Sequence, residues 1–172
     1  MNKMRAISIE KINLNIGTGG QGDKMEKSLK LLSSITGEKP VSTKTKLRIP
    51  EWGVRPGLSI GCKVTLRGKK AVEIFRRLLS AVNNTLKESN FDKFGNFSFG
   101  IKEYLDIPGV KYDPDIGITG LEVAVTLKRP GFRVKRRALR RGHIPKRHQI
   151  AKSEAIEFIK SGFNANILGG EK

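Results

Sequence analysis

The chain has few of the residues that build disulfides, metal sites and most catalytic centres. Its 172 residues include one cysteine and two histidines. Cys62 cannot form an internal disulfide or a multi-cysteine metal site on its own. His143 and His148 stand among cations, which disfavour a bound metal ion. We therefore expect no metal site and no cofactor.

Long apolar runs are also absent. No run approaches the roughly 18 to 20 residues that a membrane-spanning helix needs. Residues 1–5 lead into alternating polar and apolar residues, without the apolar centre of a signal peptide. We expect a cytoplasmic protein with no membrane partner. With 37% hydrophobic residues, the chain is long enough for one domain with its own core, so residues 1–172 are expected to form a single domain with a short tail at 165–172.

Acidic residues are missing from a long stretch near the C-terminus. Between Glu122 and Glu154 the chain has no Asp or Glu, and its net charge is +18. The Debye length of about 8 Å cannot screen cations only a few residues apart, so a phosphate backbone is the natural counter-charge. We expect nucleic acid to bind this basic insert (128–148), and a solvated basic loop is the alternative. The candidate contacts are Arg133, Lys135, Arg136, Arg137, Arg140, Arg141 and Arg147, and the two histidines should face solvent or RNA.

The charge is unevenly distributed elsewhere too. Residues 39–72 carry nine basic side chains and one acidic one, Glu51, whereas acidic residues outnumber basic ones in 86–122. We therefore expect one cationic side and one neutral or acidic side, a polarity that suits docking on RNA.

Alternating apolar and polar residues predict half-buried strands in four segments, with a shorter fifth. In the first, Ile12, Leu14 and Ile16 should point inward, and Lys11, Asn13 and Asn15 should point outward. Such alternation favours an antiparallel or mixed sheet with one open face. The predicted strands are 11–16, 41–45, 60–67, 97–102 and 121–128.

Three segments have the apolar spacing of helices that could cover the inner face. The first should start at the Asp23 and Glu26 signal and stop at Gly37, and the second should run from about Lys70 to Leu86. The third should begin near Ser153 as its cap, with Glu157 in the first turn, and end before Gly162. The sequence thus predicts an α+β two-layer sandwich with helices on one face.

Two catalytic motifs have to be weighed. The segment 57–61 matches G-x-S-x-G, but here a strand follows Ser59, whereas a nucleophile elbow needs a helix there. The segment Gly17 to Gly22 matches the G-x-G-x-x-G of dinucleotide sites and opens a helix. Asp23 would repel a pyrophosphate at that helix start, and Glu38 lies in a turn instead of at a strand end. We expect no enzyme, and a dinucleotide-binding enzyme remains the alternative.

The chain also resembles a known family. Residues 8–17, the TGEKPV segment 36–41, the segment 60–68 with its KVTLRG block, and residues 95–103 resemble the "L five" family of large-subunit ribosomal proteins, in that family's order and spacing. The basic insert resembles the archaeal and eukaryotic form. The resemblance implies a structural protein that holds 5S ribosomal RNA in the central protuberance, beside large-subunit rRNA and neighbouring ribosomal proteins.

The resemblance also implies particular contacts. On the polar sheet face the 5S rRNA contacts fall on Asn15 and Thr65, where ordinary strand polarity is the alternative, and on Glu38, where many relatives carry Gln. A carboxylate accepts hydrogen bonds but repels a phosphate, so the role of Glu38 stays open. Lys63 and Arg67 complete the candidate 5S rRNA site.

A second implied contact is a basic loop (44–57) that reaches the transfer RNA in the P site. Trp52 offers a flat surface to a ribose or base, and burial in the core is the equal alternative. Phe94, Phe97 and Phe99 suggest a stacking platform, but most of them share a face with Ile101, which favours core packing. The cations of the loop are Lys44, Lys46, Arg48 and Arg55.

Overall fold

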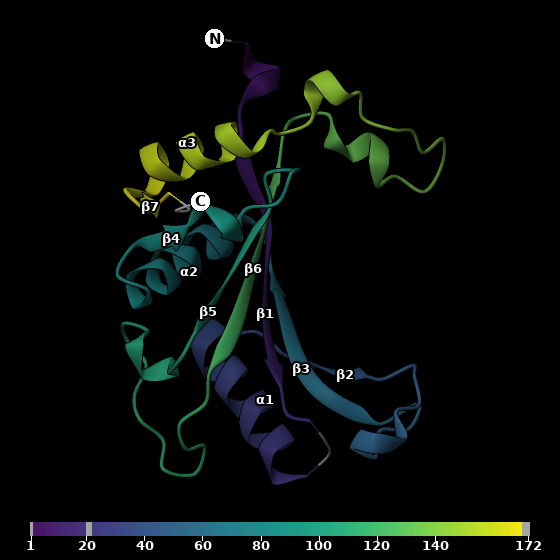
Figure 1. The fold of residues 1–172 in the computed structure, drawn as a ribbon, viewed down its shortest axis with the longest axis vertical. Helices are drawn as coiled ribbons and strands as arrows, with labels where there is room; N and C mark the ends of the chain where they lie inside the picture. The colour runs from purple at the N-terminus through teal and green to yellow at the C-terminus, as the bar shows by residue number, and fades with distance from the viewer. Residues whose placement is uncertain (1, 20–21, 170–172) are drawn as a thin grey trace.

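The computed structural model describes residues 2–19 and 22–169, which fold into a twisted sheet with helices on one side (Figure 1). The strands are β1 (Ser8–Gly17), β2 (Val41–Lys44), β3 (Ser59–Leu66), β4 (Thr85–Lys87), β5 (Phe97–Ile101), β6 (Leu121–Lys128) and β7 (Asn166–Leu168). The α-helices are α1 (Asp23–Thr36), α2 (Gly68–Ala81) and α3 (Lys152–Phe163). Short 3-10 helices are η1 (Lys3–Arg5), η2 (Pro50–Trp52), η3 (Glu88–Asn90), η4 (Tyr104–Asp106), η5 (Phe132–Lys135) and η6 (Lys146–His148).

The main sheet has five antiparallel strands in the order β2-β3-β1-β6-β5. The central strand β1 sets the register for both neighbours: Asn15 lies opposite Lys63 of β3 on one side and Glu122 of β6 on the other. All five strands coincide with the segments that the alternation predicts. The predicted α+β class and five-strand sheet are therefore confirmed.

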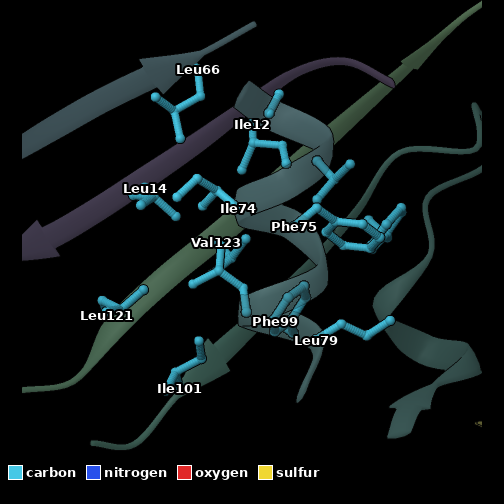
Figure 2. Packing of buried hydrophobic residues seen from close by; sticks show 14 of the residues in the cluster. Ile12, Leu14, Leu66, Ile74, Phe75, Leu79, Phe99, Ile101, Leu121 and Val123 are labelled. Atoms are coloured by element: carbon cyan, nitrogen blue, oxygen red, sulfur yellow. The ribbon is translucent and has the colours of Figure 1, made fainter. Parts of the chain in front are cut away.

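The apolar residues of the strands make the core with two of the helices. Ile12 and Leu14 of β1 are fully buried, as are Phe75 and Leu79 of α2 (Figure 2). The helix α1 packs on β3, and α2 packs on β1. Because strand residues alternate between faces, burying this side sends every second residue of β1 and β3 to the other side. The other side carries the candidate 5S rRNA site.

The second helix is shorter than the sequence predicts. It ends at Ala81, and Asn83 and Asn84 then adopt left-handed backbone angles, with φ of 54° and 53°. Asn tolerates this conformation better than other residues with a side chain, so the pair terminates the helix. The predicted helical residue Leu86 lies instead in β4, which pairs in parallel with β7. Strands of three residues are too short to show an alternating pattern.

The third helix starts differently from the prediction. Its cap position is Ala151 and not Ser153, and the carboxylate of Glu154, in the first turn, accepts the N–H of Ala151 at 3.0 Å. The helix continues through Gly162 to Phe163, and Asn164 ends it with φ of 53°. Figure 1 shows α3 at one end of the molecule, beside α2, and the rings of Phe163 and Phe75 meet edge to face at 4.7 Å.

The first helix also departs from its expected cap. Asp23 is the first helical residue, and the cap position is Gly22, which makes no side-chain hydrogen bond. The end agrees with the prediction, since Gly37 adopts φ of 65° and its N–H donates to the carbonyl oxygen of Ser33 at 2.8 Å. A left-handed residue at this position favours glycine.

The lone thiol gives a test of the core. Cys62 is fully buried in β3, and burial raises the pKa of the thiol to about 11. A thiol of the unfolded chain ionises near pH 8.5. Between that pH and about 11 the unfolded state therefore releases a proton that the folded state keeps, and the contribution of Cys62 to stability falls as the pH rises.

The burial of Cys62 can be tested by chemical labelling. At pH 8 we expect a thiol reagent to label Cys62 slowly in the native protein. The labelling rate should rise with urea in parallel with unfolding followed by circular dichroism. Native labelling at the rate of the denatured chain would contradict the burial.

Candidate nucleic-acid interface

The sheet face opposite α1 and α2 carries polar side chains that reach solvent. We call it the polar face, made by Asn13 and Asn15 of β1, Lys63 and Thr65 of β3, and Glu122 of β6. Lys63, Thr65 and Glu122 are exposed, and the two asparagines are half-buried. Three of the predicted 5S rRNA residues, Asn15, Lys63 and Thr65, therefore come together on one open surface.

Hydrogen bonds between neighbouring strands order this face. Thr65 Oγ1 donates to Asn13 Oδ1 at 2.8 Å, and Asn15 Nδ2 donates to Glu122 Oε2 at 3.2 Å. Among the described residues, the NH₂ group of Asn13 and the carbonyl oxygen of Asn15 have no further partner. The face thus presents donors and acceptors held in fixed positions, which is the arrangement that hydrogen-bonded recognition of a 2′-hydroxyl or a base edge requires.

The two halves of the polar face differ in charge and in side-chain size. Toward β3 it is cationic, with Lys63 in the strand and Arg67 exposed just before α2. Toward β5 the exposed residues Ala124, Ser98 and Gly100 are small, and Glu122, which pairs with Gly100, is the acidic residue of this half. Small side chains let a ligand backbone approach the sheet closely, while the cations on the other half can meet phosphates.

Glu38 lies at the edge of this surface, in the turn between α1 and β2. Its carboxylate forms an ion pair with Lys70 of α2; the Lys70 side chain is exposed and that of Glu38 is half-buried. The neighbouring ammonium offsets the repulsion that the carboxylate would exert on a phosphate. Glu38 is therefore not isolated from cations, although its predicted RNA contact remains a prediction.

The basic loop forms a small hairpin beyond β2 and β3. Ile49 and Val54 exchange backbone hydrogen bonds of 2.9 and 3.0 Å, and Val54 is buried at the base of the tip. Trp52, in η2 at the tip, is 74% exposed, which rules out the alternative of a core tryptophan. The predicted loop cations Lys44, Lys46, Arg48 and Arg55 are all exposed around it.

The proposed aromatic platform is divided between core and surface. Phe97 and Phe99 are buried in β5, as the shared face with Ile101 predicts, whereas Phe94 is 57% exposed. The three rings therefore do not form a continuous stacking surface on the sheet. Phe94 instead lines a pocket that residues of the basic insert also line.

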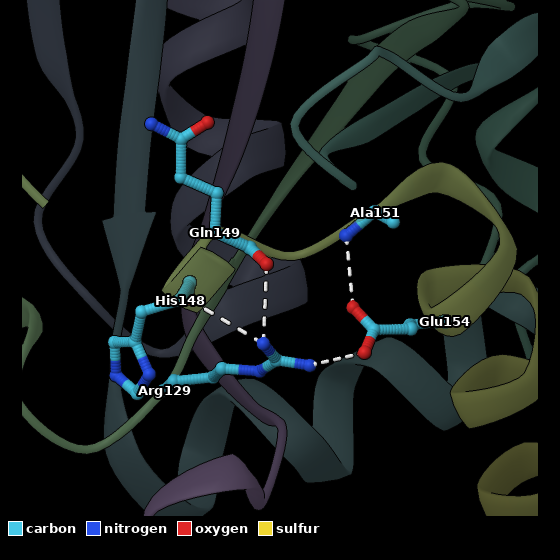
Figure 3. Close-up of polar contacts among 5 residues, drawn as sticks. All are labelled: Arg129, His148, Gln149, Ala151 and Glu154. Atoms are coloured by element: carbon cyan, nitrogen blue, oxygen red, sulfur yellow. Dashed lines mark hydrogen bonds and ion pairs between the residues drawn. The ribbon is translucent and has the colours of Figure 1, made fainter. Parts of the chain in front are cut away.

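A buried arginine holds the two ends of the basic insert together. Arg129 is 3% exposed, and its guanidinium donates to Glu154 Oε1 at 2.6 Å and to the backbone oxygens of His148 and Gln149 (Figure 3). The insert leaves β6 just before Arg129 and returns to α3 just after Gln149. Arg129 thus joins the two ends of the insert and is a structural residue, although it belongs to the acid-free run that predicts nucleic-acid binding.

Two further contacts hold the insert. Arg136 Nη1 bonds Glu10 Oε1 at 2.8 Å, and the Glu10 side chain is buried where β1 bulges against β6. His148 lies 2.9 Å from the carbonyl oxygen of Pro130 through Nε2, so it does not simply face solvent or RNA as predicted. Arg136 therefore bonds to the protein through Nη1, while 42% of its side chain remains exposed. The other candidate cations Arg133, Lys135, Arg137, Arg140, Arg141 and Arg147 are exposed.

The basic segments occupy one side of the molecule in Figure 1. The basic loop and the basic insert extend to the right of the view from opposite ends of the sheet, and the acidic segment 103–115 lies at the lower left. This arrangement agrees with the expected separation of charge.

The structure does not support the alternative dinucleotide site. Gly17 ends β1 and Gly22 caps α1, while Gly20 and Gln21 lie outside the described residues. Asp23 occupies the first helical position, where a pyrophosphate would bind, and Glu38 pairs with Lys70. The helices α1 and α2 pack on the same face of an antiparallel sheet, whereas a dinucleotide-binding fold has a mostly parallel sheet with helices on both faces.

Comparison with known proteins gives the family. Residues 2–55 match the family model described as ribosomal protein L5, and residues 59–158 match the model for the C-terminus of the same ribosomal family. The chain belongs to the L5 family of ribosomal proteins. The two matched segments of this L5 family member contribute strands to one sheet, with β1 and β2 from the first and β3, β5 and β6 from the second.

Curated relatives match over nearly their whole length. The chain is 53% identical to the large ribosomal subunit protein uL5 of Sulfurisphaera tokodaii, over 99% of this chain and 97% of that protein. It is 50% identical to the uL5 of Nanoarchaeum equitans, over 96% of this chain and 98% of that protein. These archaeal relatives agree with the archaeal or eukaryotic form that the basic insert indicates.

Two kinds of feature are absent from the part of the chain that the structure describes. Within residues 2–19 and 22–169 no helix has the length and apolar content to cross a membrane. The same residues include no group of three or more His, Cys, Asp or Glu side chains placed to bind a metal ion.

The ion pair between Arg129 and Glu154 gives a testable prediction. The N–H of Ala151 holds the pKa of Glu154 below its usual range, and Arg129 adds to this effect against the opposing effect of burial. A lowered pKa means that the carboxylate stabilises the fold above the pKa of the unfolded chain, near 4.3, and that this stability is lost as the pH falls through the folded value. We expect Glu154→Gln to lower the free energy of unfolding in urea at pH 7 by about 1–3 kcal/mol, because Arg129 loses its counter-charge.

Glu157→Gln on the same helix is the matched control, since Glu157 is exposed, and its effect should stay within about 0.5 kcal/mol. The difference between wild type and Glu154→Gln should shrink below pH 4. Equal stability of the two variants at pH 7 would show that the pair does not hold the insert.

Proposed function

We propose that this protein is a structural, non-catalytic constituent of the large ribosomal subunit that binds 5S rRNA through the polar face. The observation that carries the proposal is the hydrogen-bonded row of Asn13, Asn15 and Thr65 on an uncovered sheet face. Membership of the L5 family and the relatives' name, large ribosomal subunit protein, support the ribosomal location in the cytoplasm.

The recognition combines two kinds of contact. Asn15 and Thr65 supply hydrogen bonds in fixed positions, and Lys63 and Arg67 supply charge to phosphates beside them. The Glu38 carboxylate, with Lys70 next to it, can accept from a base amino group or a 2′-hydroxyl at the edge of the face. The helices on the other side stiffen the sheet without entering the interface.

The two basic segments extend the contact beyond 5S rRNA. The basic loop presents Trp52 at an exposed tip among Lys46, Arg48 and Arg55, which suits stacking on a ribose or base of the P-site tRNA. The insert presents exposed arginines to large-subunit rRNA, in the central protuberance where neighbouring ribosomal proteins also lie. Residues 1–172 act as one domain in this proposal, because both matched segments build the same sheet.

A general DNA-compacting protein is the rival that the charge alone would allow. Such a protein would bind duplex DNA and 5S rRNA with similar affinity, since a phosphate backbone is common to both. The fixed hydrogen-bonding groups of the polar face instead suit 2′-hydroxyls and folded RNA. Competition between duplex DNA and 5S rRNA therefore separates the two functions.

Filter binding to 5S rRNA across a salt series separates the contribution of the neutral hydrogen bonds from that of the phosphate contacts. We expect Thr65→Ala and Asn15→Ala to weaken binding with little change in the slope of log K against log salt, because they remove neutral hydrogen bonds. Arg67→Gln should reduce that slope by about 0.7 to 0.9, because one phosphate contact is lost.

Ser33→Ala is the control for Thr65→Ala, since Ser33 is an exposed hydroxyl residue of α1 on the opposite side of the sheet. Lys30→Gln in α1 is the control for Arg67→Gln. Both should leave 5S rRNA affinity within about two-fold of wild type. The proposed interface fails if the helix-side controls weaken binding as much as the polar-face variants do.

A further inference from the structure

A cavity of about 520 Å³ lies between the basic insert and the turn before β5. Its apolar lining includes Phe94, Leu127, Phe132 and Ile150. Phe94 is 57% exposed, whereas Leu127, Phe132 and Ile150 are buried. The exposed ring of Phe94 offers a flat apolar surface for a planar ligand, and the volume falls within the roughly 300–1,000 Å³ of small-molecule sites. We call this cavity the insert pocket.

The turn that carries Phe94 is packed tightly on Ile150, in the segment that joins the insert to α3. Gly95 adopts φ of 75°, and a Cβ placed there would lie 2.6 Å from Cγ2 of Ile150. A side chain at position 95 would therefore push the turn off Ile150. The close packing at Gly95 fixes the turn against Ile150, and Phe94 and Asn96, on either side of Gly95, line the pocket together with residues of the insert.

The insert pocket is lined by two lysines and one histidine. Lys135, His143 and Lys146 lie around it, and none of the lining residues is acidic. Lys135 already places its ammonium 4.6 Å from the centroid of the Phe132 ring. The pocket therefore combines apolar lining residues with a potential that attracts an anion.

Two side-chain amides in the pocket lining, those of Asn96 and Gln149, each use one of their two polar groups within the protein. Asn96 Oδ1 accepts the N–H of Leu127 at 3.4 Å, so its NH₂ group remains a donor. Gln149 Nε2 donates to the carbonyl oxygen of Ile144 at 3.3 Å, so its own carbonyl oxygen remains an acceptor. Among the described residues neither remaining group has a partner. A donor and an acceptor in one pocket match the hydrogen-bonding edge of a nucleobase.

We propose that the insert pocket takes up a single unpaired nucleotide of ribosomal RNA. The base stacks on Phe94 and meets the amides of Asn96 and Gln149, while its phosphates lie against Lys135 and Lys146. An aliphatic ligand would leave the amides and cations unused, and a basic peptide would be repelled. This inference rests on the proposed contact of the insert with rRNA, and it adds that one base is extruded there.

The test uses the full chain bound to large-subunit rRNA together with 5S rRNA. We expect Phe94→Ala to lower the affinity by about 5- to 100-fold with an unchanged salt slope, since base stacking is neutral. Phe94→Tyr should retain affinity because it keeps the ring. Leu139→Ala is the matched control: Leu139 is 83% exposed on the same insert but does not line the pocket, so its loss should change affinity less than about two-fold.

Chemical probing of base reactivity gives the second readout. One unpaired nucleotide should be protected by the wild type and Phe94→Tyr, and it should become reactive with Phe94→Ala. Wild-type affinity of Phe94→Ala, or protection that no Phe94 variant changes, would overturn the inference. Displacement from the pocket by polyglutamate but not by a single-stranded oligonucleotide would assign it to an acidic peptide and also overturn it.

The outcomes separate this inference from the proposed function. If Arg133→Gln and Arg140→Gln reduce the salt slope while Phe94→Ala has no effect, the insert binds rRNA without a nucleotide in the pocket, and only the inference fails. If neither the arginine variants nor the polar-face variants weaken RNA binding, the proposed function fails as well.

Discussion

The two-residue period of the central strand is the constraint on which the other features depend. β1 is paired on both sides, so it cannot shift its register without breaking two ladders at once. Its apolar residues, such as Ile12 and Leu14, are fully buried, and this burial holds Asn13 and Asn15 on the opposite face. The positions of the polar groups are thus set by the packing of the core, and the binding face needs no stabilising energy of its own to keep its geometry.

The strands could be predicted from the sequence because this constraint produces a regular residue pattern. Alternation identified all five strands of the main sheet and placed Asn15 and Thr65 on the open side. The helix ends could not be predicted in the same way. The helix α2 stops at a pair of left-handed asparagines, and α3 is capped by the Glu154 carboxylate, so both ends depend on local backbone geometry that an apolar stripe does not encode.

Charge composition predicted a partner but not the role of each cation. Arg129 and Arg133 stand in the same acid-free run, yet Arg129 is buried against Glu154 and Arg133 is exposed. The difference comes from an acidic residue 25 positions away and from two carbonyl oxygens of the returning chain. Likewise, the aromatic spacing placed Phe97 and Phe99 in the core but gave no sign that Phe94 would line a pocket with residues of the insert, because the position of its turn depends on the close packing of Gly95 on Ile150.

The ion pairs show how a self-repelling segment can be positioned. Arg129 and Arg136 of the insert bond to Glu154 and Glu10, which come from α3 and β1. Burying Arg129 carries a desolvation cost, and the charge-assisted bonds to Glu154 and the carbonyl oxygens offset it. Acidic residues from outside the run therefore pair with Arg129 and Arg136, while exposed cations such as Arg140 and Arg141 remain open to a ligand. Because these exposed cations repel one another, a polyanion that binds them gains both its own attraction and the relief of that repulsion. The same cations that would weaken a free loop thus favour the bound state.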